Sequence, residues 1–296
     1  MRSVRRRIGE WGRVASVALL AIVVFSAVGC RGLGRFAGRA DERMSFQSPL
    51  PPLAQRHLSL TQIARHLTTR AQQADSVRLQ GELIVGAAGR RNPRQRFDLL
   101  LFAKPPDFAR VRALQNGATF FDVLLRGQNL EVALVPERTL YRGSVAELRQ
   151  YPQVLGGVDV RELLDSLFVE SALLRKLWRG GEPLFYASRD HYEIRFALPR
   201  GGEERYRLRK ADLLVDRYQR FVGNRRVAEI RFWRYELVES KYLIPTQIAL
   251  EGASGASVLL SANQVSVNEP VTDALRAPIP SADLQVKSFA EAAREF

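Results

Sequence analysis

The chain has 296 residues, 46% of them hydrophobic, with 45 Lys and Arg against 31 Asp and Glu; the formal charge is +14 and the pI is near 10.6. This apolar content excludes disorder of the whole chain, because it is sufficient to bury a core. A single cysteine excludes a scaffold of intrachain disulfides. The charge alone would suggest a nucleic-acid partner, but forty of the basic residues are Arg, which favours a compositional bias over forty selected contacts.

The first thirty residues divide into a basic, an apolar and a small-residue segment. Residues 1–13 carry five Arg and one Glu, whereas residues 14–28 carry no charge. This run is shorter than the roughly 20 residues of a membrane-spanning helix and matches the apolar region of a signal peptide. Ala27-Val28-Gly29-Cys30 follows and resembles a bacterial lipobox, although the family usually has Leu where Ala27 stands. The resemblance implies cleavage between Gly29 and Cys30 by signal peptidase II; the alternative is an uncleaved anchor with an incidental cysteine.

The lipobox resemblance also implies a location. Cys30 would carry diacylglycerol and a further acyl chain, and each buried CH₂ contributes roughly 0.8 kcal/mol, so the mature chain would be stably held at a membrane. Arg31 follows, whereas an aspartate in this place retains enterobacterial lipoproteins in the inner membrane. The resemblance therefore favours the outer membrane, with the protein facing the periplasm. Loss of residues 1–29 leaves 40 basic and 30 acidic residues, a charge of +10.

The mature chain begins with a segment of irregular composition. Residues 30–56 contain scattered Gly, Pro and Arg without periodicity and predict a flexible tether. We expect residues 57–296 to form a single domain with a short C-terminal tail. Its first element is a helix, because Ser59 and Gln62 form a capping box before apolar residues at helical spacing. The period then changes to two, which predicts strands over residues 77–85, 94–103, 108–114, 119–125 and 130–135; a brief run at residues 139–142 could extend this series.

A helical insert divides the strands into two series. Ser144 and Glu147 form a second capping box, and an apolar face follows from Val160 to Trp178. The alternating pattern then returns and predicts strands over residues 183–187, 191–198, 204–215, 226–238, 243–251 and 257–267. These elements predict an α+β fold, an open antiparallel β half-barrel of about ten or eleven strands wrapped around the leading helix and the central helical insert. The run from Phe97 to Phe102 is apolar on both faces, which predicts partial cover on the outside as well.

Several segments resemble the LolA/LolB/LppX group of envelope carriers. They are Leu101–Pro106 leading into Phe108–Arg112, Tyr141-Arg142-Gly143, Tyr242–Ile248 with its internal proline, and Val265–Pro270. The resemblance implies a half-barrel around a lipid-binding cavity closed by helices, and a function in binding or transferring a lipid or lipoprotein acyl chain. RseB-like stress sensors resemble the same half-barrel, so an envelope sensor or scaffold module that binds a partner protein is the alternative.

Catalytic motifs are lacking in the sequence. His57, His66 and His191 do not have metal-ligand spacing, and neither a Gly-x-Ser-x-Gly elbow nor a phosphate-binding loop occurs. We therefore expect no enzyme, no cofactor and no metal site. Nucleic acid is disfavoured as a partner, because an exported, membrane-tethered domain would seldom meet it.

An arginine stripe is the candidate head-group site. Arg205, Arg207 and Arg209 alternate with Tyr206 and Leu208, so on a strand the three guanidinium groups share one face. Such a stripe suits the phosphate of an anionic lipid. An ordinary outer face of a strand is the alternative.

Two aromatic pairs are the candidate cavity lining. Phe120-Phe121 and Phe232-Trp233 lie in predicted strands, where successive side chains point to opposite faces. One ring of each pair could then line a cavity while its neighbour points away. A filled core is the alternative, and the pattern does not separate the two.

Overall fold

The computed structural model describes residues 46–53, 57–71, 74–86, 94–151, 160–179, 182–253 and 255–294. The expected signal peptide, Gly29, Cys30 and the first part of the tether lie outside the described residues. No helix among the described residues is long and apolar enough to cross a membrane.

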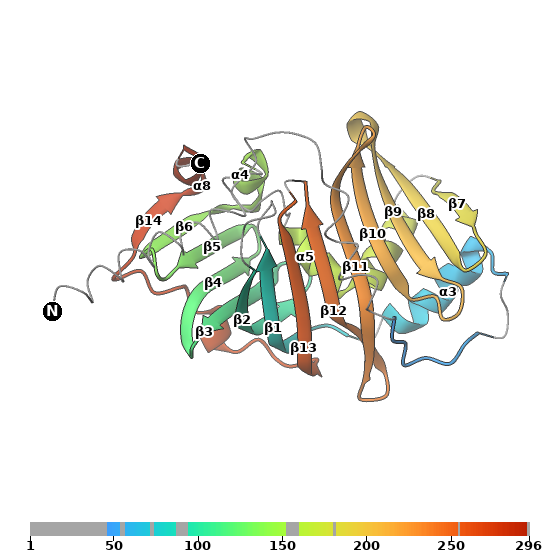
Figure 1. Cartoon of the computed structure of the whole chain (residues 1–296), viewed down its shortest axis with the longest axis horizontal. Coiled ribbons are helices and arrows are strands. Elements are labelled where there is room, and N and C mark those ends of the chain that lie inside the picture. The colour runs from blue at the N-terminus through green and yellow to red at the C-terminus, as the bar shows by residue number, and fades with distance from the viewer. Residues whose placement is uncertain are drawn as a thin grey trace.

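One open sheet of fourteen strands forms the body of the molecule (Figure 1). In chain order the strands are β1 Val77–Gly86, β2 Gln95–Lys104, β3 Phe108–Gln115, β4 Ala118–Arg126, β5 Asn129–Leu134, β6 Thr139–Ser144, β7 Leu184–Ala187, β8 His191–Leu198, β9 Gly202–Arg209, β10 Val215–Val222, β11 Arg225–Val238, β12 Tyr242–Gly252, β13 Ser257–Val267 and β14 Gln285–Ser288. Their order across the sheet is β14-β6-β5-β4-β3-β2-β1-β13-β12-β11-β10-β9-β8-β7. Antiparallel pairing of β1 with β13 therefore joins two meanders into one sheet.

The half-barrel architecture is confirmed, but the number of strands is larger than expected. The strand expected over 204–215 ends at Arg209, because residues 210–214 form a turn in which Leu213 has a φ of 57°. The backbone N–H of Leu214 donates to Asp212 Oδ1 at 3.1 Å within this turn. A separate strand, β10, follows, and β14 adds a parallel partner to β6. Both additions lay in segments without clear alternation.

Three helices contact one face of the sheet, called the inner face below. They are α3 Leu60–Ala71, α5 Val160–Leu167 and α6 Val169–Arg179, and their apolar side chains join one core cluster with those of the strands. The capping box that begins α3 is formed, since Ser59 N donates to Gln62 Oε1 at 2.8 Å and Gln62 N donates to Ser59 Oγ at 3.3 Å. The helical insert and its end before Gly180 agree with the sequence pattern.

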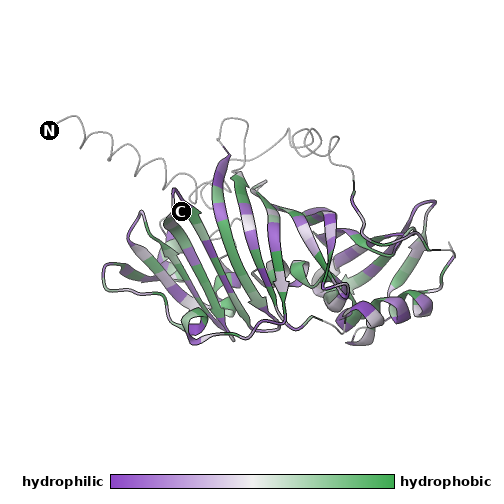
Figure 2. Cartoon of the chain, turned by 90° about the horizontal axis from the view of Figure 1, so that it is seen from below, coloured by the Kyte–Doolittle hydropathy of each residue, from purple (hydrophilic) through white to green (hydrophobic). Residues whose placement is uncertain are grey.

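Side chains along the strands alternate between buried and exposed, and Figure 2 shows the resulting hydrophilic and hydrophobic bands. In β2 the inner residues Phe97, Leu99 and Leu101 are at most 2% exposed. The hairpin between β3 and β4 turns at Asn116 and Gly117, whose φ angles of 53° and 78° suit a two-residue turn of this kind. Alternation and turn residues together set the register of the meander.

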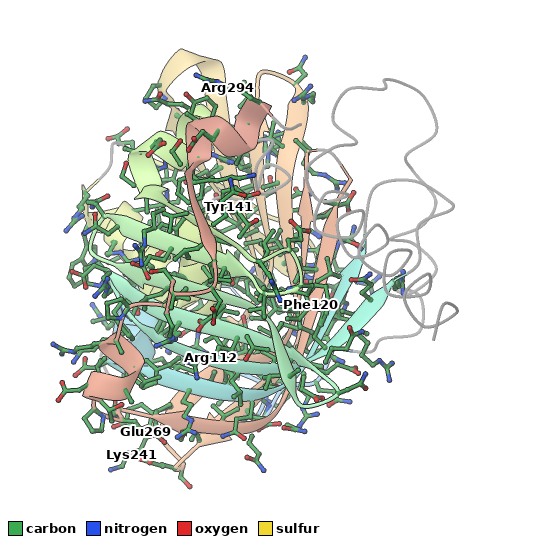
Figure 3. All side chains as sticks on the ribbon, turned by 90° about the vertical axis from the view of Figure 1, so that its left-hand side faces the viewer. Arg112, Phe120, Tyr141, Lys241, Glu269 and Arg294 are labelled. Carbon is green, nitrogen blue, oxygen red and sulfur yellow. The ribbon has the colours of Figure 1, made fainter. Side chains whose placement is uncertain are left out.

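The outer face of the first meander is covered by the C-terminal segment 268–284, which we call the strap. Figure 3 shows the chain running from the level of Glu269 past the first meander to Arg294. The strap contains the short helix α7 Asp273–Arg276 and leads through β14 into α8 Phe289–Arg294. A second apolar cluster lies beneath it, formed by Phe102, Phe108, Leu124, Ala133, Leu140 and Ile279. The expected partial outer cover is therefore present.

The helix α4 Val145–Gln150 offers a local test of capping. Ser144 Oγ accepts a hydrogen bond from Glu147 N at 3.0 Å. Replacing Ser144 with Ala is expected to lower the free energy of unfolding by about 1 kcal/mol, because one N–H at the helix start loses its acceptor. Urea denaturation measures this loss. Ser144→Asp keeps an acceptor and should stay close to the unchanged chain; equal losses in both variants would contradict the capping role.

Candidate functional site

The space between the inner face and the three helices is the candidate site. Nearly all side chains that meet there are apolar and tightly packed, including Ile63 and Leu67 of α3 and Leu173 of α6, each 0% exposed. A cavity of about 30 Å³ remains at one rim, where α3 and the start of α6 meet β11 and β12. This volume holds about one water molecule and is far below the roughly 300–1,000 Å³ of ligand pockets. In the part of the chain that the structure describes, apolar side chains fill the rest of the space between the sheet and the helices.

Phe120 and Phe121 both pack toward the inner face, contrary to the simple alternation expected. Leu114 of β3 pairs with Thr119, so that Phe120 is the extra residue of a β-bulge. Both rings consequently lie against Phe97, with ring-centroid separations of 4.9 Å and 5.9 Å. The bulge adds one aromatic ring to the core that a regular strand would have placed outside.

Phe232 and Trp233 are separated by a second irregularity. Phe232 pairs with Ile248 and Arg234 pairs with Gln247, which leaves Trp233 as an extra residue of β11. Phe232 is 1% exposed and belongs to the core, whereas Trp233 is half-buried. None of the four aromatic residues is among the lining residues of the cavity. A role for them in holding a ligand stays a prediction.

Part of the expected tether is packed on the sheet beside this irregularity. Gln47 N donates to the carbonyl of Trp233 at 2.7 Å, and Tyr235 N donates to the carbonyl of Gln47 at 3.3 Å. The ring of Phe46 lies beneath the guanidinium of Arg209 at 4.0 Å. Residues 46–53 therefore approach α3 along the sheet and are not a free linker.

Arg70 connects α3 with α6 and with the sheet. Its Nη1 and Nη2 donate to the carbonyls of Asp212 and Leu213 in the β9–β10 turn, both at 3.0 Å. Nη2 also lies 3.1 Å from Glu170 Oε1 at the start of α6. Both side chains line the cavity, and neither Arg70 Nε nor Glu170 Oε1 has a hydrogen-bond partner among the described residues. The pair is a polar contact inside an otherwise apolar interface.

Burial dominates the ionisation of this cluster. It raises the pKa of Glu170 from 4.5 to about 7, although the guanidinium of Arg70 acts in the opposite direction and Asp212 adds to the rise. Burial likewise raises the pKa of Tyr235, whose hydroxyl donates to the carbonyl of Val215 at 2.6 Å. With this pKa, the carboxyl of Glu170 changes its charge near neutral pH.

A second polar contact lies near the other end of α6. Lys176 Nζ forms an ion pair with the buried carboxylate of Glu204 on β9. Tyr218 on β10 donates its hydroxyl hydrogen to Glu204 Oε1 at 3.1 Å. The helix α6 is consequently tied directly to the sheet near its end by Lys176, and at its start through Glu170 to Arg70 of α3, which contacts the β9–β10 turn.

Arg205, Arg207 and Arg209 share one face of β9, as expected, and this is the outer face. Arg207 Nε and Nη2 donate to the two carboxylate oxygens of Asp216, both at 2.8 Å. Arg205 pairs with Glu203, and Arg209 Nε lies 3.3 Å from Asp212 Oδ1. The sheet separates the three guanidinium groups from the packed interior. Their contact with a lipid head group stays a prediction.

The three histidines do not converge. His57 and His66 are exposed near α3, whereas His191 Nε2 lies 3.1 Å from Asp216 Oδ2 on the outer face. Burial raises the pKa of Asp216, but the hydrogen bonds from His191 and Arg207 outweigh it and hold this pKa below its usual value. Among the described residues no group of three or more His, Cys, Asp or Glu is placed to hold a metal ion.

Several important residues were absent from the sequence-based candidates. Arg70 and Glu170 lie on helices where an exposed charge is the ordinary expectation, and Glu204 is the first residue of the strand predicted over 204–215. The available signal was positional: Glu204 stands between Glu203 and Arg205, at a place where alternation requires an inward side chain. A charge at an inward position needs a buried partner, which Lys176 supplies.

Solved structures share this fold. A DUF1329 family protein from Desulfovibrio piger has a TM-score of 0.51 at 15% identity, covering 72% of this chain and 93% of that chain. A domain from Vibrio parahaemolyticus assigned to outer membrane lipoprotein sorting has a TM-score of 0.50 at 12% identity, covering 73% and 97%. A LolA superfamily protein from Nitrosomonas europaea has a TM-score of 0.49 at 13% identity, covering 75% and 99%.

These similarities concern the fold. No protein-family model matches the sequence, and no curated protein matches it. At 12% and 15% identity the first two structures establish the architecture alone. The chain therefore has an open half-barrel fold that it shares with these two structures, as the sequence resemblance implied.

Proposed function

We propose that the chain is an exported, lipid-anchored protein that binds a lipid or lipoprotein acyl chain between the inner face of its half-barrel and the helices α3, α5 and α6. Cys30 is the proposed point of lipid attachment, and the outer membrane, facing the periplasm, is the proposed location. The proposed binding is non-covalent. Its free energy comes from apolar surface removed from water, which stabilises a complex by about 25 cal/mol per Å². No catalytic step is part of the proposal.

One observation carries this proposal. The helices meet the sheet through a layer of apolar side chains, in a fold shared with a domain assigned to outer membrane lipoprotein sorting. An acyl chain can replace helix–sheet contacts in such a layer without exposing apolar surface to water. The lipobox resemblance is a second, independent support, since it concerns residues outside the half-barrel.

Entry of an acyl chain requires the helices to move away from the sheet, because the described side chains between them are packed and the cavity at their rim is only about 30 Å³. Arg70 opposes this movement through its two hydrogen bonds to the β9–β10 turn. A further link lies just before α3, where Leu58 N donates to the hydroxyl oxygen of Tyr192 at 2.8 Å. The stability of these links sets how often the interior opens.

Replacing Arg70 with Ala is therefore expected to increase the uptake of a fluorescent fatty acid by the purified chain. Each hydrogen bond from a charged donor contributes about 1.5–3 kcal/mol, so the fraction of open molecules should rise by at least about tenfold. Fluorescence titration measures the uptake, and mass spectrometry of lipids extracted from the purified chain identifies a natural ligand.

Arg65→Ala is the matched control, because Arg65 is an exposed residue of the same helix. It should leave uptake unchanged. Absence of extracted lipid, together with no uptake by either the unchanged chain or a folded Arg70→Ala variant, would exclude the proposed binding mode.

A scaffold module that binds a partner protein is the second candidate. The specific observation in its favour is the packed interior, since a scaffold has no need of a cavity. Purification from membranes with a partner protein in equal amount and without lipid would support this function over the first.

A further inference from the structure

Two strand connections and the end of a helix lie together at one end of the second meander, which consists of strands β7 to β13. The β8–β9 connection and the β10–β11 turn lie together, because Gly223 N donates to the carbonyl of Gly201 at 3.3 Å. The last turn of α6 reaches the same end, as the contact of Lys176 with Glu204 shows. The chain then enters β7 at Leu184. We call these segments, residues 176–179, 182–184, 198–203 and 220–226, the hairpin end; it lies at the upper right of Figure 1.

Large apolar side chains are exposed at the hairpin end. Trp178 is 70% exposed, and Leu184 and Val222 are each 57% exposed. These are the three highest values among the exposed large hydrophobic residues of the described chain. They come from three different elements, α6, β7 and β10, so their exposure is a property of this end of the sheet and not of one loop.

The same end is basic. Residues 176–184, 198–203 and 220–226 include only two acidic residues, Glu182 and Glu203, against six basic residues: Lys176, Arg179, Arg200, Arg220, Arg225 and Arg226. At the opposite end, the connections 188–190, 210–214 and 239–241 hold three basic and three acidic residues. Lys176 and Arg226 form ion pairs with Glu204, Glu229 and Glu251, so the exposed cations next to Trp178 and Val222 are Arg179 and Arg225.

We propose that the hairpin end docks on the surface of a bilayer that contains anionic phospholipids. Trp is favoured at the level of lipid head groups, and short aliphatic side chains beside it can enter the outer part of the acyl layer. Lys and Arg around them are attracted by anionic head groups. Arg179 and Arg225 are exposed beside Trp178 and Val222 and take this role.

Docking goes beyond the binding of an acyl chain in the interior and beyond attachment through Cys30. An anchor at the start of the chain fixes the distance to the membrane but not the orientation of the domain. Contact through the hairpin end sets the strands at a steep angle to the membrane, because the β8–β9 and β10–β11 connections are at the ends of long strands. The end of α6 at Trp178 then lies at the lipid surface.

The full chain, reconstituted in vesicles of phosphatidylcholine and phosphatidylglycerol, provides the test. Lipids brominated near the head group quench tryptophan fluorescence only at short range. We expect the Trp178→Phe variant to be quenched less than the unchanged chain, because only the quenching of Trp11 and Trp233, which both proteins contain, remains. Equal quenching of the two proteins would overturn the proposal. This conclusion does not depend on the way in which residues 1–30 attach the chain to the vesicle.

Two further variants separate docking from folding and from cargo binding. Val222→Glu should reduce the quenching of Trp178 to the level found with vesicles of phosphatidylcholine alone. Leu237→Glu changes a side chain that is 41% exposed near the β11–β12 turn, at the opposite end of β11, and should leave quenching unchanged. Equal losses in both variants would contradict docking. Fatty-acid uptake should be the same in both, so failure of docking and failure of cargo binding are distinguishable.

Discussion

Replacing Arg110 with Met is expected to lower the free energy of unfolding by about 3–5 kcal/mol, because it removes one partner of a buried ion pair. The Arg110 side chain is 3% exposed, and its Nη2 donates to Asp122 Oδ2 at 2.7 Å. Nη1 donates to three carbonyls of the strap, those of Ala274, Leu275 and Ala277, at 3.0–3.2 Å. One substitution thus leaves a buried carboxylate without its main partner and releases the strap.

Urea denaturation measures the loss, and limited proteolysis shows whether the strap becomes cleavable before the rest of the chain. Arg112→Met is the matched control. Arg112 contacts the same carboxylate, with Nε at 3.0 Å from Asp122 Oδ2, but its side chain is 41% exposed. We expect this variant to lose about 1 kcal/mol or less. A loss as large as that of Arg110→Met would show that charge around Asp122, and not the strap contacts, determines stability.

Local signals in the sequence were sufficient for most of the elements. The capping boxes at Ser59 and Ser144 and the period of two in the predicted strands each depend on residues close in the chain, and each is present in the structure. The same holds for the end of α6 before Gly180. Such signals fix the type and the order of elements, and therefore the half-barrel.

Register and irregularities depend on contacts that local patterns do not contain. The bulge at Phe120 is imposed by the pairing of β4 with β3, and it reverses the direction expected for that ring. The turn at Leu213 replaces a strand because Asp212 accepts a local hydrogen bond from Leu214 N and the neighbouring carbonyls bind Arg70. The pairing of β4 with β3 and the position of Arg70 are set by the tertiary structure, so the local sequence pattern does not predict either irregularity.

The candidate site was the least predictable part for the same reason. Arg70 meets the β9–β10 turn across a sequence separation of 142 residues, and nothing near Arg70 marks it as different from Arg65. The aromatic pairs were prominent in the sequence, but the cavity lies elsewhere, between charged residues of α3 and α6. Composition can identify an apolar interior, whereas the polar contacts inside it, such as that of Arg70 with Glu170, depend on the tertiary structure.

Glu170→Gln is expected to remove a pH dependence of stability that the buried carboxyl imposes. The pKa of Glu170 is raised from 4.5 to about 7 in the folded chain, so the folded state holds this proton more tightly than the unfolded state. The resulting stability is fully present below pH 4.5 and is lost as the pH rises through about 7. The difference amounts to about 3 kcal/mol, since one pKa unit corresponds to about 1.4 kcal/mol.

Urea denaturation of the chain and the Gln variant at pH 4.5, 6 and 8 measures this difference, with the first pH set at the ordinary pKa of the group. The two proteins should be nearly equally stable at the lowest pH, and the variant should be the more stable one at the highest. Arg70→Met should show the opposite trend, with its largest loss at the highest pH, because ionised Glu170 then lacks its cation. The two proteins could instead differ in free energy of unfolding by the same amount at every pH. Glu170 would then keep one charge state across this range, which would contradict the prediction. If the trend is found, packing around the start of α6 becomes less stable as Glu170 ionises. The unchanged chain should then take up fatty acid faster at the highest of these pH values than at the lowest, whereas Glu170→Gln should show no such rise.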